Sequence, residues 1–348
     1  MPQRGKGGGT GQHRCAVRGG YAAAPYEGAG ETETMRAMLL TAPGEIRERD
    51  APAPQPGQGQ LLIRPLACGL CASELDLYLG RNPWQAYPAL LGHEVVGEVV
   101  ALGPGAAGFA PGQTVAAARA GGGYADLTAL DAADALPLPP GLPAEQALAE
   151  PLACAVNTVR ELAPAPADRI VLLGAGFMGL LLTQLLRPLA PSLLLAAARR
   201  PEARQLALSL GATEACDPAE VQGRVHELTG GAGVDLVIEA SGSEPLLAIA
   251  ASLLRPEGTL GIVGYHQGQG RQVPLHEWNW KALRLANCHF RSPARMVDGA
   301  RRGLDLAARG ALDLRPLLTH RFPLPDLQKA FATAAARPPG FVKAVIVP

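Results

Sequence analysis

Two patterns of hydrophobic and polar residues follow one another along the chain. From 35 to about 136, short apolar and β-branched runs such as "GQLLIRPLAC" and "GHEVVGEVVALG" are separated by Gly and Pro. From about 168, apolar runs such as "RIVLLGAG" alternate with amphipathic stretches such as "PEARQLALSLG". The first pattern predicts a mainly β, barrel-like domain, because closely spaced short strands with turn residues between them are typical of barrels. The second predicts βαβ units on a parallel sheet.

The two ends of the chain follow neither pattern. Residues 1–34 are Gly-rich and unperiodic, so they cannot bury enough apolar surface to offset the entropy of ordering, and we expect a disordered tail. After about 291, helical stretches near 296–309 and 325–336 precede a terminal strand, "FVKAVIVP". The predicted class is α/β with two domains. The first spans 35–155 and is completed by 292–348, and the second spans 156–291.

Composition excludes several functional classes. The 348 residues carry 31 basic and 31 acidic side chains, so no basic surface for nucleic acid is implied. The six cysteines are too sparse for a secreted disulfide scaffold, which favours a reducing cytoplasm. No apolar run approaches the roughly 20 residues that cross a membrane, and the first residues lack the apolar core of a signal peptide. We expect a cytoplasmic protein that binds neither membranes nor nucleic acid.

The segment "LLGAGFMG" carries the clearest ligand-binding signal. Gly174, Gly176 and Gly179 stand in G-x-G-x-x-G spacing, with Phe177 and Met178 in the variable positions, between an apolar strand and a helix. Such glycines permit a tight turn, a close approach of backbone N–H groups to a pyrophosphate, and close packing of helix on strand. The spacing alone could be an ordinary turn. In its strand–turn–helix context, followed by further βαβ units, it predicts a doubly wound dinucleotide-binding domain of the Rossmann type.

The end of the next strand bears on which dinucleotide binds. NAD-binding domains place an acidic residue there to accept hydrogen bonds from the adenosine ribose. This chain has Ala198 followed by Arg199 and Arg200, which leaves room for a 2′-phosphate and offers bidentate donors to it. NADP(H) is therefore favoured over NAD(H), although the arginines could simply be solvated in an enzyme that accepts either cofactor. Gly264, at the end of the later strand "GTLGIVGY", is a further cofactor-binding candidate.

The C-x-x-C pair in "PLACGLCASELD" raises a question of metal or redox chemistry. A structural zinc site needs a second pair of ligands, and outside the tail the other cysteines stand singly. A thioredoxin-type pair begins a helix in a small βαβ fold, whereas Cys68 and Cys71 lie in a β-rich region. What remains is a catalytic metal assembled from distant segments, with His93 in "LLGHEVVGE" and Glu150 in "LAEPLACAVNTV" as candidate partners.

Taken in order, five motifs make the chain resemble the zinc-dependent medium-chain alcohol and polyol dehydrogenases. They are "CGLCASELD", "GHEVVGEVVALGPG", "AEPLACAVNTV", "GAGFMG" and "VKAVIVP", and the resemblance runs through them from residue 35 to the C-terminus. The resemblance implies a GroES-like β-barrel catalytic domain beside a Rossmann domain. It also implies hydride transfer between an alcohol or polyol and the nicotinamide, with zinc polarising the substrate oxygen.

The same resemblance assigns the zinc ligands. It makes Cys71, His93 and Glu150 the three protein ligands, as in the sorbitol- and threonine-dehydrogenase-like branch in which a glutamate replaces a cysteine. Cys68 is then a small apolar neighbour. The net charge of the site agrees, because one thiolate, one carboxylate and a neutral imidazole balance Zn²⁺, whereas a second thiolate would weaken it as a Lewis acid.

Other residues near these motifs take supporting roles by the same resemblance. Ser73 matches the hydroxyl that relays the substrate proton, and Glu74 matches an acidic residue that orients a ligand. Glu94 is either an occasional fourth ligand or an outer group, and we favour the latter. Cys154 is a rival to Glu150 as a ligand, although a buried thiol is the better interpretation. Asp76 stands where many relatives carry a relay histidine.

One departure from the family concerns a second metal. The segment "GQTVAAARAGGGYADL" contains no cysteine-rich lobe, so we expect one catalytic zinc per subunit and no structural zinc. The expected partner is a small alcohol or carbonyl substrate, in a homodimer or homotetramer as in relatives. Two alternatives stay open: a metal-free quinone or enone reductase on the same scaffold, which elemental analysis would distinguish, and an NADPH-binding protein without catalysis, which would show binding without turnover.

Overall fold

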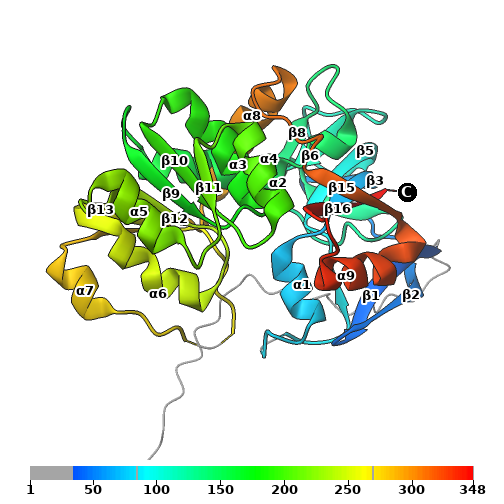
Figure 1. Ribbon diagram of the computed structural model, residues 1–348. Helices are drawn as coiled ribbons and strands as arrows, with labels where there is room; N and C mark the ends of the chain where they lie inside the picture. The colour runs from blue at the N-terminus through cyan, green and yellow to red at the C-terminus, as the bar shows by residue number, and fades with distance from the viewer. Residues whose placement is uncertain (1–33, 84, 269, 348) are drawn as a thin grey trace, which may run out of the picture.

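The computed structural model describes residues 34–83, 85–268 and 270–347. The tail expected over 1–34 lies outside the described residues except for Thr34, which begins the first strand. Figure 1 shows two lobes side by side, one built from the middle of the chain and one that joins its two ends. The α/β class and both expected architectures are present.

The lobe that joins the chain ends is mainly β. Its larger sheet has the order β15-β16-β3-β5-β6-β8, with β7 pairing on β3, and a smaller sheet has the order β2-β1-β4. The strands are β1 (Thr34–Ala42), β2 (Glu45–Pro52), β3 (Gln60–Gly69), β4 (Ala89–Leu90), β5 (Glu94–Leu102), β6 (Thr114–Ala117), β7 (Thr128–Asp131), β8 (Ala135–Pro137), β15 (Leu318–Pro323) and β16 (Lys343–Val347). The expected C-terminal strand is β16, and it pairs antiparallel with β3, with Val345 opposite Gly69.

The other lobe is a parallel sheet with helices around it. Its order is β11-β10-β9-β12-β13-β14, and every neighbouring pair is parallel. The strands are β9 (Arg169–Leu173), β10 (Leu193–Ala197), β11 (Glu214–Cys216), β12 (Val234–Glu239), β13 (Leu254–Ile262) and β14 (Arg284–Asn287). The strand order reverses between β9 and β12, and ligands of such sheets bind outside the carboxyl ends of the strands at this reversal.

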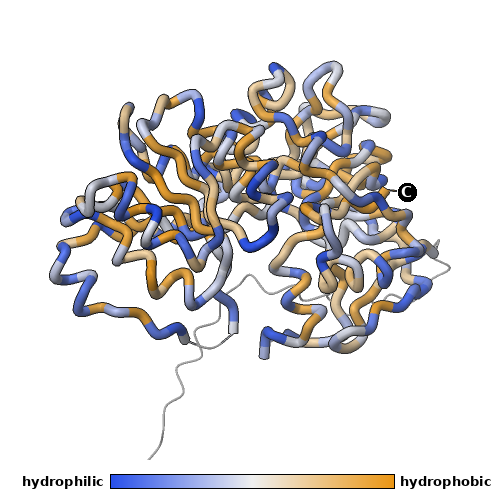
Figure 2. Tube along the Cα trace, in the orientation of Figure 1, coloured by the Kyte–Doolittle hydropathy of each residue, from blue (hydrophilic) through white to orange (hydrophobic). Residues whose placement is uncertain are grey.

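Helices complete both lobes and connect them. They are α1 (Ala72–Tyr78), α2 (Ala149–Leu162), α3 (Phe177–Leu186), α4 (Pro201–Leu210), α5 (Val221–Thr229), α6 (Glu244–Leu253), α7 (Leu275–Trp280), α8 (Pro293–Ala308) and α9 (Leu327–Ala336). Figure 2 shows the central strands of the parallel sheet as almost continuously apolar, as expected for strands covered on both faces. None of the helices in the described ranges combines the length and apolar character needed to cross a membrane.

Buried side chains of α2 belong to a core cluster that also includes residues of β5, β6 and β9. Leu152 and Ala153 on this helix are fully buried. Because α2 packs against elements of both lobes, it lies where the two lobes meet, and its first turn carries a candidate ligand. The candidate ligand Glu150 occupies that turn.

Candidate active site

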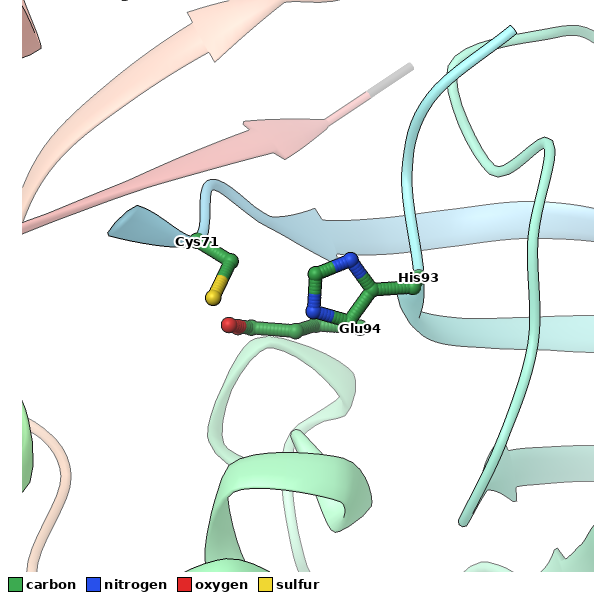
Figure 3. A group of neighbouring side chains, drawn as sticks. All are labelled: Cys71, His93 and Glu94. Atoms are coloured by element: carbon green, nitrogen blue, oxygen red, sulfur yellow. The ribbon is translucent and has the colours of Figure 1, made fainter. Parts of the chain in front are cut away.

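Antiparallel pairing of β3 and β5 brings Cys71 and His93 together. Gly69 ends β3 opposite Glu94, the first residue of β5. Cys71 follows two residues after Gly69 as the N-cap of α1, and His93 immediately precedes Glu94. Ligand atoms of Cys71, His93 and Glu94 all lie within 4.8 Å of one another. Figure 3 shows the three side chains converging on one point.

The ring of His93 is oriented by a buried carboxylate. His93 Nδ1 donates a hydrogen bond to Glu74 Oε1 at 2.8 Å, which leaves Nε2 as the ring nitrogen available to a metal. Glu74 is fully buried and also accepts hydrogen bonds from the Gly92 N–H at 2.7 Å and the Tyr124 hydroxyl at 2.9 Å. Burial lowers the pKa of His93, but the negative charges of Glu74 and Cys71 outweigh it and raise that pKa well above its usual value.

Glu94 is held by a buried ion pair. Its Oε1 accepts a hydrogen bond from Lys343 Nζ at 2.6 Å, and both side chains are almost completely buried. Its Oε2 is buried and has no hydrogen-bond partner among the described residues. A Cβ at Gly69 would lie 1.9 Å from this oxygen, so only glycine leaves room for the carboxylate. Lys343 Nζ also lies 4.5 Å from the ring centroid of Phe177, which connects this pair to the glycine-rich turn.

Glu150 lies close by but outside the group within 4.8 Å. Cys154 Sγ donates a hydrogen bond to Glu150 Oε1 at 3.4 Å, one turn along α2. Burial raises the pKa of the Glu150 carboxyl, and the charge of His93 opposes this rise. Compared with the expectation from sequence, the structure therefore brings Glu94 nearest to Cys71 and His93. The reason is that Glu94 is fixed by strand pairing, whereas Glu150 arrives from a separate helix.

Ser73 and Asp76 belong to α1, the helix that begins directly after Cys71. Ser73 Oγ donates a hydrogen bond to Cys71 Sγ at 3.3 Å, so the expected relay hydroxyl adjoins the ligand sulfur. Asp76 forms an ion pair with Arg81 at 2.9 Å. Cys68 lies in the hydrophobic core, 1% exposed, and it is absent from the ligand group. This placement agrees with its interpretation as an apolar neighbour.

The chemistry of the donor set fits zinc. A cysteine sulfur, a histidine nitrogen and carboxylate oxygens are the ligands that Zn²⁺ takes in proteins, and the carboxylate–histidine contact at Glu74 is typical of metal-bound histidines. The unpartnered Oε2 of Glu94 is a buried acceptor that a cation would satisfy. The site also gathers more acidic groups than Lys343 alone neutralises, so a bound cation would restore charge balance.

The glycine-rich turn is built for close approach of a ligand. Gly174 follows β9 with φ +114°, a conformation that favours glycine. A Cβ at Gly179 would lie 1.9 Å from the Gly174 carbonyl oxygen, whereas a Cβ at Gly176 would meet nothing within 4 Å. Gly176 is the N-cap of α3, with Phe177 and Met178 in its first turn. The turn therefore combines tight internal packing with open space at the helix N-terminus, as a bound pyrophosphate requires.

The other cofactor candidates lie at the carboxyl ends of β10 and β13, on either side of the central strands β9 and β12. A Cβ at Gly264, after β13, would lie 2.3 Å from both Glu239 Oε2 and the Gly242 nitrogen. Ala198 is buried after β10, Arg199 is exposed, and the guanidinium of Arg200 donates a hydrogen bond to the Phe341 carbonyl at 2.6 Å.

Two contributors to the site escaped the sequence reasoning. Tyr124 lies in an unremarkable Gly-rich segment, and nothing in that segment indicates that its hydroxyl reaches Glu74. Lys343 offered a signal, since it is a single charged residue in the otherwise apolar run "FVKAVIVP". A lysine in a buried strand needs a buried anionic partner, and Glu94 provides it.

Comparison with protein families now identifies the chain. A model described as "Alcohol dehydrogenase GroES-like domain" matches residues 57–140, and one described as "Zinc-binding dehydrogenase" matches residues 178–302. The chain belongs to the zinc-dependent medium-chain dehydrogenase family. It is accordingly an oxidoreductase of the alcohol dehydrogenase type.

Individual dehydrogenases align over nearly the whole chain. L-galactonate-5-dehydrogenase of Escherichia coli (strain K12) is 27% identical, over 90% of this chain and 99% of that protein. L-threonine 3-dehydrogenase of Pyrococcus horikoshii is 28% identical, over 84% of this chain and 92% of that protein. A zinc-binding dehydrogenase from Sinorhizobium meliloti 1021, solved bound to NADP, has a TM-score of 0.80 at 27% identity and covers 91% of this chain and 100% of its own.

Proposed function

We propose that this medium-chain dehydrogenase is a zinc-dependent, NADP(H)-linked enzyme that interconverts an alcohol or polyol and the corresponding ketone or aldehyde. The observation that carries the proposal is the convergence of Cys71, His93 and Glu94 within 4.8 Å. Lys343 connects this group to Phe177 of the glycine-rich turn. A metal site and a dinucleotide site that share a residue in this way favour chemistry between the two ligands.

For the zinc ligands we propose Cys71, His93 and Glu150, with one catalytic ion per subunit and no structural zinc. Glu94 lies nearest to the first two, but Lys343 already balances its charge. Glu150 has only a thiol as a hydrogen-bond donor among the described residues, so its half-buried charge has the greater need of a cation. We place Glu94 beside the ion, held by Lys343.

Residues around the ion have separate tasks. Glu74 holds the ring of His93 with Nε2 directed to the metal position. Ser73 Oγ, beside Cys71 Sγ, takes the proton of the substrate hydroxyl and passes its own proton outward. When bound, zinc supplies Lewis acidity at the substrate oxygen and the nicotinamide supplies the hydride acceptor.

The cofactor preference rests on the end of β10. Gly174, Gly176 and Gly179 bind the pyrophosphate, and Gly264 lies at the carboxyl end of β13 in the same region. Ala198 offers no carboxylate to repel a 2′-phosphate, and Arg199 beside it is exposed. The NADP bound to the Sinorhizobium relative supports this preference.

Substrate class and assembly are proposed from relatives. L-galactonate-5-dehydrogenase and a sorbitol dehydrogenase, both 27% identical, carry polyhydroxylated substrates in their names. We therefore propose a polyol-like alcohol as substrate, a homodimer or homotetramer as the assembly, and the cytoplasm as the location. Sheet membership supports the division into 35–155 with 292–348 and 156–291, because β15 and β16 join the sheet of β3.

The decisive experiment combines metal analysis with a substrate screen. Purified protein should contain zinc near one equivalent and should oxidise members of an alcohol and polyol panel faster with NADP⁺ than with NAD⁺. Ser73→Ala should lose turnover while it keeps its zinc. Zinc-free protein that reduces quinones or enones would contradict the proposal and favour the metal-free reductase, and tight NADPH binding without any turnover would favour a binding protein.

A further inference from the structure

Four arginines gather where the two lobes meet, close to the end of β10. Arg199 and Arg200 belong to the turn between β10 and α4, Arg81 follows α1, and Arg337 follows α9. Partial burial and the positive charges of Arg200, Arg199 and Arg81 lower the pKa of Arg337, and Asp76 opposes this effect. Arg337 therefore lies close enough to the other three arginines to be repelled by them, although it comes from a separate element.

Two of these four guanidinium groups already have partners. Arg81 is paired with Asp76 at 2.9 Å, and Arg200 donates to the Phe341 carbonyl at 2.6 Å. Nearby Arg204 turns back to the Ala198 carbonyl at 2.8 Å and to Asp217 at 3.3 Å. By contrast, the guanidinium groups of Arg199 and Arg337 have no hydrogen bond or ion pair to any residue that the structure describes. The positive charges of Arg199 and Arg337 are therefore not balanced by any direct partner among the described residues.

The loop that starts at Arg337 is docked on the nucleotide-binding lobe. Phe341, in this loop, accepts the hydrogen bond from Arg200, and the Gly340 N–H donates to Glu202 Oε1 at 3.3 Å. Arg337 itself is only partly buried, so its side chain still reaches solvent, and it has φ +47° at the C-terminus of α9. The loop between α9 and β16 thus covers the first turn of α4 and brings a cation from one lobe to the ribose-binding end of the other.

We infer that Arg337 is a specificity-determining residue that, together with Arg199, binds the 2′-phosphate of NADP(H) across the boundary between the lobes. The inference rests on the proposed use of NADP(H). A 2′-phosphate carries nearly two negative charges and three acceptor oxygens, and it would project from the ribose beside Ala198. Two unpartnered guanidinium groups can each give it charge-assisted, bidentate hydrogen bonds, and its charge would relieve their repulsion.

Equilibrium binding to the full chain tests the inference without relying on turnover. Dissociation constants are measured by calorimetry for NADP⁺, NAD⁺ and adenosine 2′,5′-bisphosphate. Arg337→Gln should weaken binding of NADP⁺ and of the bisphosphate about tenfold, as expected for a lost charge-assisted hydrogen bond, and change NAD⁺ binding less than about twofold. Arg337→Lys should recover part of the loss. The matched control is Arg309→Gln, since Arg309 is exposed and follows α8 as Arg337 follows α9.

The outcomes separate this inference from the proposed function. If the unaltered chain binds NADP⁺ more tightly than NAD⁺ but Arg337→Gln leaves that ratio unchanged, the role of Arg337 is wrong and the cofactor proposal stands. Equal weakening of both cofactors would show a structural role for Arg337 and would also overturn the inference. If the unaltered chain binds NAD⁺ more tightly, both the cofactor proposal and the inference fail.

Discussion

The glycine-rich turn and the metal centre are assembled in opposite ways. The turn uses six consecutive residues, from Gly174 to Gly179. It acts through backbone N–H groups and through glycines, whose lack of a Cβ permits close packing. The proposed metal centre uses side chains that follow the end of β3, lie at the start of β5 and belong to the start of α2, and a lysine from the last strand. A local backbone site is encoded in one stretch of sequence, whereas an assembled side-chain site depends on strand pairing and on the docking of a helix.

The same contrast governs tolerance to substitution. In the turn, a substitution is restricted by steric contacts within the folded backbone, which are present before any ligand binds. In the metal centre, the constraint is electrostatic, since buried acidic groups need compensating cations. Substitutions in the two regions should therefore separate fold stability, cofactor binding and metal binding.

The largest effect is expected at the metal. Glu150→Gln keeps the side-chain shape but removes the anionic ligand, so zinc affinity should fall more than about 100-fold, beyond the range of outer-shell substitutions. Glu94→Gln should lower the zinc affinity less, because Lys343 already balances the charge of Glu94. Zinc titration against a competing chelator measures both variants. A greater loss in Glu94→Gln would make Glu94 the third ligand.

A large effect on the fold is expected at the turn. Gly179→Ala places a Cβ 1.9 Å from a carbonyl oxygen, so backbone must move, and we expect a loss of about 1–3 kcal/mol in stability together with weaker NADP⁺ binding. Gly176→Ala is the control, since its Cβ meets nothing within 4 Å in the protein. It should keep its melting temperature and lose only cofactor affinity. Thermal unfolding and NADP⁺ titration distinguish the two, and equal destabilisation would refute the steric argument.

An intermediate effect on zinc affinity is expected at the residues that orient the ring of His93. Glu74→Gln weakens the acceptor that orients the ring, and zinc affinity should fall about 10–100-fold. Tyr124→Phe removes one hydrogen bond to the same carboxylate, worth about 1 kcal/mol, so the zinc affinity of this variant should fall about fivefold. Zinc competition measures both. Unchanged affinity in Glu74→Gln would remove this residue from the site.

The smallest effect on function is expected at the amino end of the parallel sheet. Burial raises the pKa of Asp235, but hydrogen bonds from Arg255 and Arg169 outweigh it and lower that pKa to about 2. Because the folded pKa is depressed, the stabilisation is complete above the unfolded value of about 4 and is lost as pH falls through about 2.

Asp235→Asn should therefore cost roughly 2 kcal/mol of unfolding free energy at pH 7, with the difference from the unaltered protein shrinking below about pH 4. Zinc content should not change. Denaturant unfolding across pH measures the cost. Asp313→Asn is the control, since Asp313 pairs with the exposed Arg315 and should cost less than about 1 kcal/mol. A cost that does not depend on pH would contradict the electrostatic origin.

Some features of the fold and of the candidate site could be predicted from the sequence, and others could not. Alternation of apolar strands and amphipathic helices predicted the parallel sheet, and the order of motifs predicted the family, both of which are confirmed. Gly179 could be assigned to tight packing from spacing alone, and its contact with Gly174 agrees. Tyr124 could not be predicted, because its contact with Glu74 joins residues 50 positions apart through packing.

The sequence by itself determined the order of elements, the glycine-rich turn and the residue types available for a metal, because these depend on local conformation and periodicity. Only the tertiary structure decided which side chains meet. Strand pairing set Glu94 beside Cys71 and His93, the last strand delivered Lys343, and the loop after α9 brought Arg337 to the end of β10. Long-range contacts of this kind depend on how whole elements pack, and no local pattern records that packing.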